Sequence, residues 1–146
     1  SMALMGIGQG KLLVTPLHMA MVAACVANQG MLMQPRLTFD QPMEELGRAM
    51  SPRTSGHMQN MMARVVTDGT ARKAFEGFNM SVGGKTGSAQ NPAGDSHAWF
   101  IGFAPVERPQ IAISVVVENG GYGGSTAAPI ARHALELAIG LGLIRP

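Results

Sequence analysis

The stretch Gly83-Gly84-Lys85-Thr86-Gly87-Ser88-Ala89 is the most informative part of this chain. Its small residues leave the backbone of an extended strand open to a ligand. Lys85 supplies a point charge for a carboxylate. Thr86 and Ser88 place two hydroxyls on one face, because residues two apart in a strand share a face. A solvated structural strand would have the same composition, so the stretch alone leaves both interpretations open.

The residues around this stretch predict an antiparallel sheet of three strands. One strand covers about 81–90, the second 97–104 and the third 111–117, with turns at 91–95 and 106–110. The third strand is an almost unbroken apolar run, which predicts burial on both faces. A helix is expected after Gly123-Gly124, capped by Ser125 or Thr126. We expect it to cover the sheet with the apolar residues Ile130, Ala134, Leu137, Ala138 and Leu141.

Helical spacing dominates the first half of the chain. Thr15 followed by Pro16 is a typical helix start, and Gly30 stands where a left-handed C-terminal cap belongs. A second helix is expected from Thr54 or Ser55 to Thr67, whereas residues 31–53 predict a loop with a short strand or turn near 36–38. The fold class is therefore α/β of the α+β type, an antiparallel sheet flanked by helices.

Composition excludes several classes of function. The chain has 146 residues, 46% of them hydrophobic, which is enough for one compact core. Its 11 basic and 9 acidic residues do not cluster, so no nucleic-acid partner is expected. No apolar run approaches the length of a membrane span, so this segment is not expected to contact a membrane. The single Cys25 lies among small apolar residues, and the four histidines lack ligand spacing. No metal and no cofactor are expected.

Gly84-Lys85-Thr86 also resembles the end of a phosphate-binding loop, but two observations oppose that interpretation. The motif requires a glycine at the position that Asn79 occupies, and a helix directly after the threonine. The sequence instead predicts a hairpin there. A phosphate site is therefore not expected.

Several further motifs follow in a fixed order. Upstream of the lysine strand stand Gly6-Ile7-Gly8-Gln9-Gly10, Val14-Thr15-Pro16-Leu17 and Gly69-Thr70-Ala71. Downstream stand the segment 97–105, the apolar strand, and the glycine-rich loop before Ala127-Ala128-Pro129-Ile130. In this order the chain resembles the C-terminal part of the transpeptidase domain of penicillin-binding proteins, a family of penicillin-recognising serine acyltransferases. The resemblance implies a β-lactamase/transpeptidase-like fold and covers nearly all 146 residues.

The chain departs from that family in a specific way. The family's signature set is Ser-x-x-Lys, which carries the nucleophile, a second serine motif, and Lys-Thr-Gly. Here no serine has a lysine three residues later or an asparagine two residues later. Thr70-Ala71-Arg72-Lys73 has the first spacing with threonine, but it coincides with the family's Gly-Thr-Ala feature. We therefore expect residues 1–146 to be the C-terminal portion of a transpeptidase domain that lacks the nucleophile segment, and to be inactive alone.

The resemblance implies roles for individual residues. Lys85 would raise the local positive potential, and the hydroxyls of Thr86 and Ser88 would bind the terminal carboxylate of the substrate. The backbone N–H of Ser88 would be an oxyanion-hole donor. Gly87 and Ala89 would complete a strand edge to which a peptide adds. The substrate would be a peptidoglycan stem peptide or a β-lactam. Ser88 stands where the family usually has threonine, which leaves the preference among substrates open.

The same resemblance implies the setting of the parent protein, the longer protein to which the chain would belong. It would cross-link peptidoglycan outside the cytoplasmic membrane, anchored through a segment not in this chain. The strand at 111–117 would pair with the missing N-terminal part of the domain or with another chain. A serine β-lactamase or D,D-carboxypeptidase, and a non-catalytic interaction or folding module, remain alternatives. His97 could be a general base, although the family gives that histidine no catalytic role.

Overall fold

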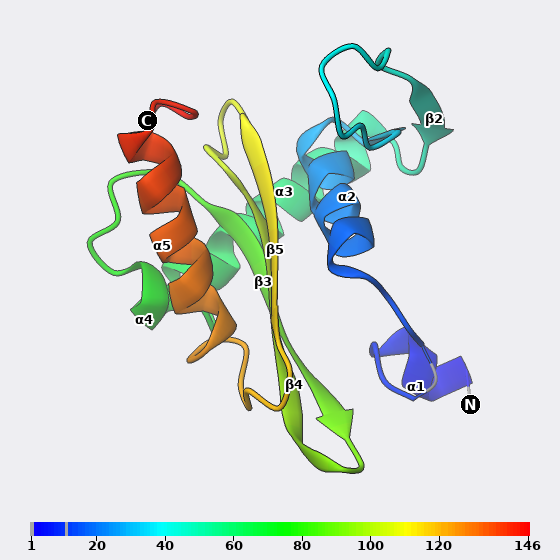
Figure 1. Ribbon diagram of the computed structural model, residues 1–146, viewed down its shortest axis with the longest axis vertical. Helices are drawn as coiled ribbons and strands as arrows, with labels where there is room; N and C mark the ends of the chain where they lie inside the picture. Colours follow the sequence, from blue (N-terminus) through cyan, green and yellow to red (C-terminus); the bar gives the residue numbers. More distant parts are fainter. Residues whose placement is uncertain (1, 11) are drawn as a thin grey trace.

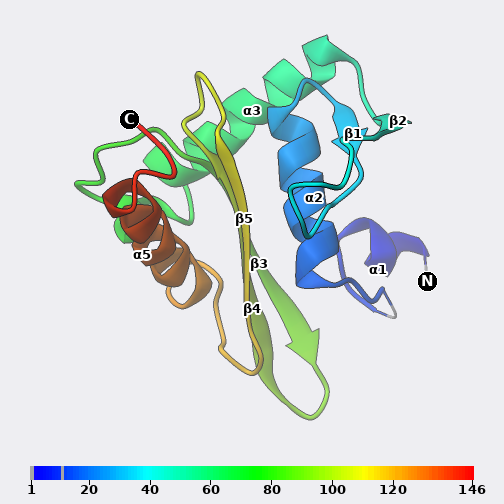
Figure 2. The same ribbon diagram turned by 45° about the horizontal axis from the view of Figure 1, so that its top comes forward.

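The computed structural model describes residues 2–10 and 12–146, which form a sheet with helices on both faces (Figure 1). Helices α4 and α5 lie on one face and α2 on the other, and α3 passes behind the sheet from the α2 side to the α4 side (Figures 1 and 2). No helix among the described residues is long and apolar enough to cross a membrane. In chain order the elements are α1 (Met2–Gly6), α2 (Pro16–Ala27), β1 (Met31–Met33), β2 (Glu45–Arg48), α3 (Pro52–Thr67), α4 (Arg72–Phe75), β3 (Gly83–Asn91), β4 (Gly94–Ala104), β5 (Ile111–Val117) and α5 (Ala127–Gly140).

The three predicted strands form one antiparallel sheet in the order β3-β4-β5. Register places Thr86 opposite Phe100 and Ser88 opposite Ala98. Phe100 is fully buried, and its ring lies where a side chain at Gly84 would be. Within the described residues β4 is central, and β3 and β5 are the outer strands. The residues of β5 are half-buried along its whole length rather than buried on both faces.

Local capping explains where the long helices begin. The hydroxyl of Thr15 accepts a hydrogen bond from the His18 N–H at 3.1 Å, and Pro16 is the first residue of α2, as predicted. Helix α3 begins earlier than predicted, at Pro52. Ser51 is its cap and accepts from the Thr54 N–H at 3.1 Å. The Ser-Pro pair is the same start signal as Thr15-Pro16, and the interpretation of residues 31–53 as loop obscured it.

The segment 31–53 contains a hairpin that the sequence did not predict. Strands β1 and β2 pair antiparallel, with Met31 opposite Arg48, and no strand lies at 36–38. Gly30 has the predicted positive φ of 83°, but Gln29 precedes it with a φ of 53° and takes the first left-handed position. A side chain on Gly30 would collide with the backbone of Met50, so glycine is needed here to let the hairpin pack against α2.

Two apolar clusters fill the spaces between sheet and helices. The larger one contains Phe75, Phe100 and Leu135 and lies between the sheet, α4 and α5. The smaller one contains Val26, Met62 and Phe103 and lies between the sheet, α2 and α3. The predicted inner face of α5 was wrong in part. The residues actually buried are Ala127, Ala128, Ala131, Leu135 and Ala138, whereas Ile130, Leu137 and Leu141 are about half exposed or more.

Buried side chains also join α2 to α3. The Ser55 hydroxyl, completely buried in α3, donates to the Val26 carbonyl at 2.6 Å. Cys25, the neighbour of Val26 in sequence, is buried, and burial raises the pKa of its thiol. The thiol is therefore held in its unreactive protonated form, and its role is packing.

Candidate functional site

A cavity of about 670 Å³ lies beside β3, the strand that carries the lysine motif. Three segments surround it: the link from α3 to α4, strand β3, and the start of α5 with the glycine-rich loop before it. They are separate in sequence, and only the folded chain brings them together. The lining residues are Gly69, Thr70, Arg72, Lys73, Ala74, Thr86, Ser88, Tyr122, Gly124, Ser125 and Pro129.

Three of the hydroxyls that line this cavity lie on β3 or in contact with it. Thr86 and Ser88 line it together, as their spacing predicts, and Thr70 adds a third from the α3–α4 link. The hydroxyls of Thr70 and Thr86 are hydrogen-bonded at 2.6 Å, so one proton of the pair remains available to a ligand. Ser88 Oγ accepts from the Gly123 N–H at 3.2 Å and keeps its own proton. The group can therefore donate to an acceptor such as a carboxylate.

Lys85 lies on the other face of β3, because neighbouring residues in a strand point to opposite sides. It is exposed, and its Nζ donates to the Thr86 carbonyl at 2.6 Å. The ammonium thus lies against the outer backbone edge of the strand rather than inside the cavity. Gly87 and Ala89 share its face and likewise do not line the cavity.

The charge of the cavity lining is positive. Arg72 and Lys73 line it from α4, no acidic side chain among its lining residues opposes them, and Lys85 lies at the adjoining strand edge. Tyr122, in the glycine-rich loop, is 76% exposed at the rim. Together with the hydroxyl donors, this favours an anionic ligand. No group of three or more His, Cys, Asp or Glu side chains in residues 2–10 and 12–146 is placed to hold a metal ion.

The glycine-rich loop touches β3 directly at Gly123. A Cβ on this residue would meet the backbone of Gly87, whose N lies 2.9 Å away, as well as the carbonyl of Trp99. Its own N–H binds the Ser88 hydroxyl. The absence of a side chain at Gly123 therefore allows the loop to fix the position of Ser88.

We expect Gly123→Ala to destabilise the folded protein by about 1–3 kcal/mol, because the added methyl must push the loop off the strand. Equilibrium urea unfolding measures this loss. Gly56→Ala is the matched control, since Gly56 lies within α3 and a methyl group added there would have nothing within 4 Å; it should be neutral or slightly stabilising. Equal unfolding free energies for both variants would contradict the close contact.

His97 has a structural role in the described contacts. Its Nδ1 accepts from the Asn119 N–H at 3.0 Å, which ties the start of β4 to the turn after β5. Nδ1 therefore holds no proton in this arrangement. His97 also does not line the cavity. These contacts give no support to a general-base role.

Two members of the site were not predicted from the sequence. Thr70 stands out there only as part of the Gly-Thr-Ala feature, and its hydroxyl contact joins positions 16 residues apart. Gly123 stands out only as part of a loop before a helix. A Gly-Thr pair directly after a helix is the signal that could have identified Thr70. No signal in the sequence alone indicates which glycine of the loop touches the strand.

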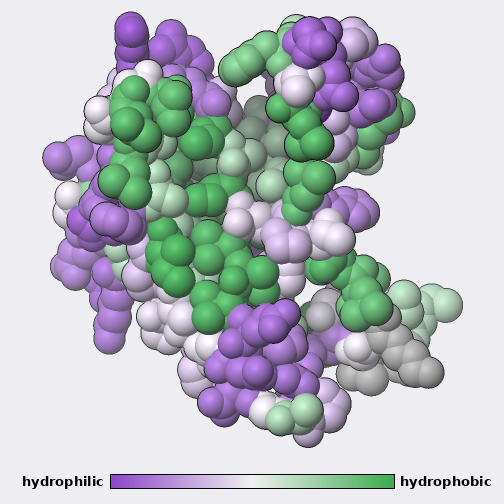
Figure 3. Space-filling model, viewed as in Figure 1, coloured by the Kyte–Doolittle hydropathy of each residue, from purple (hydrophilic) through white to green (hydrophobic). Residues whose placement is uncertain are grey.

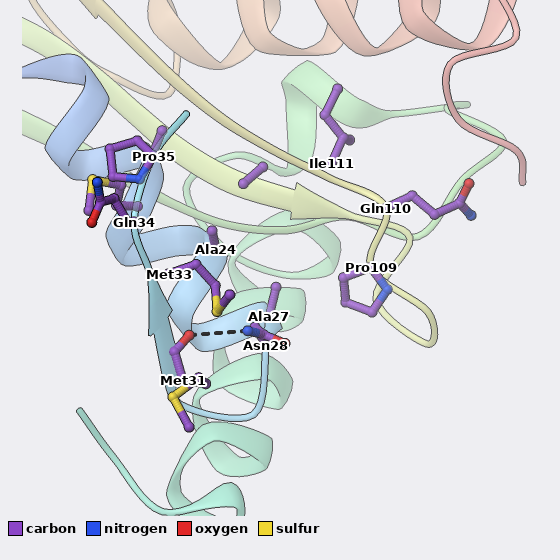
Figure 4. A pocket seen from close by; sticks show the side chains of 13 residues that line it. Ala24, Ala27, Asn28, Met31, Met33, Gln34, Pro35, Pro109, Gln110 and Ile111 are labelled. Carbon is purple, nitrogen blue, oxygen red and sulfur yellow. Dashed lines mark hydrogen bonds between the residues drawn. The ribbon is translucent and has the colours of Figure 1, made fainter. Parts of the chain in front are cut away.

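A second cavity, of about 440 Å³, lies on the far side of the sheet at the beginning of β5 (Figure 4). Small apolar residues of α2, among them Ala24 and Ala27, lie opposite the first residues of β5 across it, and β1 closes one side. The Asn28 amide donates to the Met31 carbonyl at 3.2 Å and holds β1 against the end of α2. No ionisable side chain is among its described lining residues, so it lacks the character of a catalytic site.

Comparisons with known proteins agree with this geometry. The chain is 32% identical to the peptidoglycan D,D-transpeptidase PbpA of Mycolicibacterium smegmatis, over 95% of this chain and 32% of that protein. It is 33% identical to the peptidoglycan D,D-transpeptidase MrdA of Haemophilus influenzae, over 90% of this chain and 24% of that protein. The chain thus spans about a third or less of the length of these relatives.

Solved structures of penicillin-binding proteins have the same arrangement of elements. A ceftriaxone acyl-enzyme complex of penicillin-binding protein A from M. tuberculosis matches with a TM-score of 0.81 and 32% identity, over 91% of this chain and 34% of that one. A complex between PBP2 and MreC from Helicobacter pylori matches with a TM-score of 0.85 and 29% identity, over 97% of this chain and 27% of that one. The family model for the penicillin binding protein transpeptidase domain matches residues 1–136. The chain therefore belongs to the penicillin-binding protein transpeptidase domain family, with its β-lactamase-like fold.

Proposed function

We propose that residues 1–146 are the C-terminal portion of the catalytic domain of a peptidoglycan D,D-transpeptidase. One observation carries the proposal: the hydroxyls of Thr86 and Ser88 line a positively charged cavity beside the strand whose outer edge carries Lys85. Membership of the transpeptidase family and the similarity to PbpA and MrdA support it. The nucleophilic serine belongs to a segment outside this chain.

The proposed reaction begins with that serine. Its Oγ attacks the carbonyl of the penultimate D-Ala of a stem peptide, the ester forms, and the terminal D-Ala leaves with a proton. An amine of a second stem peptide then attacks the ester, which forms the cross-link and frees the serine. A β-lactam follows only the first step, because opening its ring breaks the C–N bond without releasing a fragment.

The site residues have distinct roles in this scheme. The Ser88 N–H, on the outer edge of β3, donates to the oxyanion as charge develops on the carbonyl oxygen. The hydroxyls of Thr86 and Ser88 bind the terminal carboxylate of the substrate. The Lys85 ammonium lowers the energy of the anionic groups around it and donates toward the second serine motif. Gly87 and Ala89 leave the edge open to an added peptide strand.

The setting follows from the substrate. Peptidoglycan lies outside the cytoplasmic membrane, so the parent acts there, anchored through a segment that this chain does not contain. A serine β-lactamase or a carboxypeptidase would use the same lysine strand. The similarity to proteins named as D,D-transpeptidases favours the transpeptidase over both.

Labelling with a fluorescent penicillin tests the proposal. We expect one covalent band on the parent protein and none on residues 1–146 alone, because no serine here has a lysine three residues later to act as its base. Denaturing gels after equal incubation measure both. A parent without a band would contradict the acyl-transfer function. A stable adduct on the isolated chain would contradict the assignment of the nucleophile to another segment.

A further inference from the structure

The outer edge of β3 already has two side chains bound to it. The Lys85 ammonium donates a hydrogen bond to the Thr86 carbonyl, as described above. Further along, the Gln9 side chain reaches the same edge from the segment after α1, 79 residues away in sequence from Ser88. Figures 1 and 2 show the turn after α1 beside the far end of β3.

Gln9 makes a two-point contact with the strand. Its Nε2 donates to the Ser88 carbonyl at 3.2 Å, and its Oε1 accepts from the Gln90 N–H at 3.1 Å. A side-chain amide presents the same donor and acceptor as a peptide group. Gln9 therefore substitutes for one residue of a neighbouring strand at this position of the edge.

The backbone around Gln9 is shaped for this reach. Gly8 and Gly10 have φ values of 74° and 87°, which only glycine adopts without strain. The Gly8 N–H donates to the Met5 carbonyl at 3.0 Å and closes the turn after α1. Gln9 is half-buried, although most residues around it are exposed. The Gly-Gln-Gly sequence thus presents one amide to one place on the sheet.

We propose that Gln9 is a specificity-determining residue that marks the end of the substrate-binding edge. The N–H and the carbonyl of one strand residue point to the same side, so the Ser88 N–H faces outward together with its carbonyl. That N–H remains for the oxyanion, while Gln9 holds the next acceptor and donor along the edge. A peptide that adds to β3 pairs up to Ser88 and must displace Gln9 to pair further. This inference rests on the proposed function and concerns the same site.

The consequence is a difference between ligands. A bare β-lactam ring needs the Ser88 N–H but no further edge position. A penicillin with an acylamino side chain also carries an amide N–H that can donate to the Ser88 carbonyl, and there it competes with the Gln9 side chain. Removing Gln9 should therefore raise the acylation rate constant of the acylamino penicillin, relative to that of the bare ring, by about twofold to tenfold. This is the range expected for one net hydrogen bond.

The test compares acylation rate constants of the parent protein with two ligands: a penicillin that carries an acylamino side chain, and the same ring without it. We expect the ratio of the two rate constants to rise about twofold to tenfold in both Gln9→Ala and Gln9→Met. Methionine keeps the length and packing of the side chain but neither hydrogen bond. Gln34→Met, at a glutamine that lines the cavity on the far side of the sheet, should leave the ratio unchanged.

Three other outcomes would overturn the inference. Unchanged rate constants for both ligands in both Gln9 variants, with normal acylation of the wild type, would refute the edge role and leave the proposed function intact. An equal slowing with both ligands would instead make Gln9 a support of the strand. A wild-type protein that neither ligand acylates would refute the proposed function, and this inference with it. Melting temperatures of all variants identify any loss of folded protein.

Discussion

Lys85→Ala in the parent protein is expected to slow acylation by β-lactams about a hundredfold to a thousandfold, the usual loss on removing one preorganised group that stabilises developing charge. The Lys85 ammonium lies at the strand edge where the proposed ligand adds, one residue from the first cavity hydroxyl. Its removal leaves the other donors of the site in place, so some acylation should persist. Stopped-flow or gel-based acylation kinetics measure the effect.

The same substitution should hardly affect stability. The side chain of Lys85 is exposed, and its only described hydrogen bond goes to an adjacent backbone carbonyl. Such surface positions change the unfolding free energy by about 0.5 kcal/mol or less. Lys85→Arg is the matched control, because it keeps the charge while replacing the compact ammonium with a planar fork. We expect it to recover part of the rate.

A specific result would contradict this role. If Lys85→Ala lowered the unfolding free energy substantially while the folded fraction was acylated at the normal rate, Lys85 would be structural. An equal loss in the alanine and arginine variants would show that the shape of the ammonium, rather than its charge, is required. Thermal unfolding and acylation should therefore be measured on the same preparations.

The sheet could be predicted from sequence because its signals are local. Alternation, turn residues and apolar runs located the three strands to within a few residues, and the register then placed Thr86 and Ser88 on one face. The start of α2 was equally clear, because its cap and its proline are neighbours in sequence. The order of the motifs indicated the family without any coordinates, and the family match over residues 1–136 confirms it.

The features that could not be predicted depend on contacts between segments far apart in the sequence. The inner face of α5 was misassigned because large residues were expected to be buried, whereas the helix lies close to the sheet through alanines and leaves Ile130 and Leu137 exposed. The β1–β2 hairpin lacks an alternating pattern, and residues of β2 are exposed throughout. The contacts of Thr70 and Gln9 with β3 join distant segments, so no window of sequence contains them.

The free edge of β5 leads to the last prediction. Within the described residues, β5 pairs only with β4, and the Ser114 hydroxyl is buried without a described partner. Figure 3 shows hydrophobic residues gathered around β5 between the two helical sides of the molecule. The apolar cavity at the start of β5 continues this surface. An apolar strand with an unpaired backbone edge is prone to pair with another chain.

Residues 1–146 alone should therefore self-associate. The preceding segment of the parent, to which the proposed function assigns the nucleophilic serine, should reverse this. That segment would supply strands that pair with β5. It would also bring its serine to the opposite edge of the sheet, near Ser88 of β3. We expect a mixture of the two pieces to elute as a one-to-one complex. Labelling by fluorescent penicillin should change from none to a clear band on the added piece.

Lys85→Ala provides the control for this experiment, because it changes the β3 edge and leaves β5 untouched. The variant chain should assemble with the added piece as well as the wild type does, but label far more slowly. Labelling would then fall without a loss of assembly, because labelling depends on the β3 edge and assembly on the β5 edge of the same sheet. Light scattering that finds the isolated chain monomeric at high concentration, together with slow amide exchange along 111–117, would contradict the open edge. In that case the backbone groups of β5 would be hydrogen-bonded within the chain, and the added piece would have to dock elsewhere.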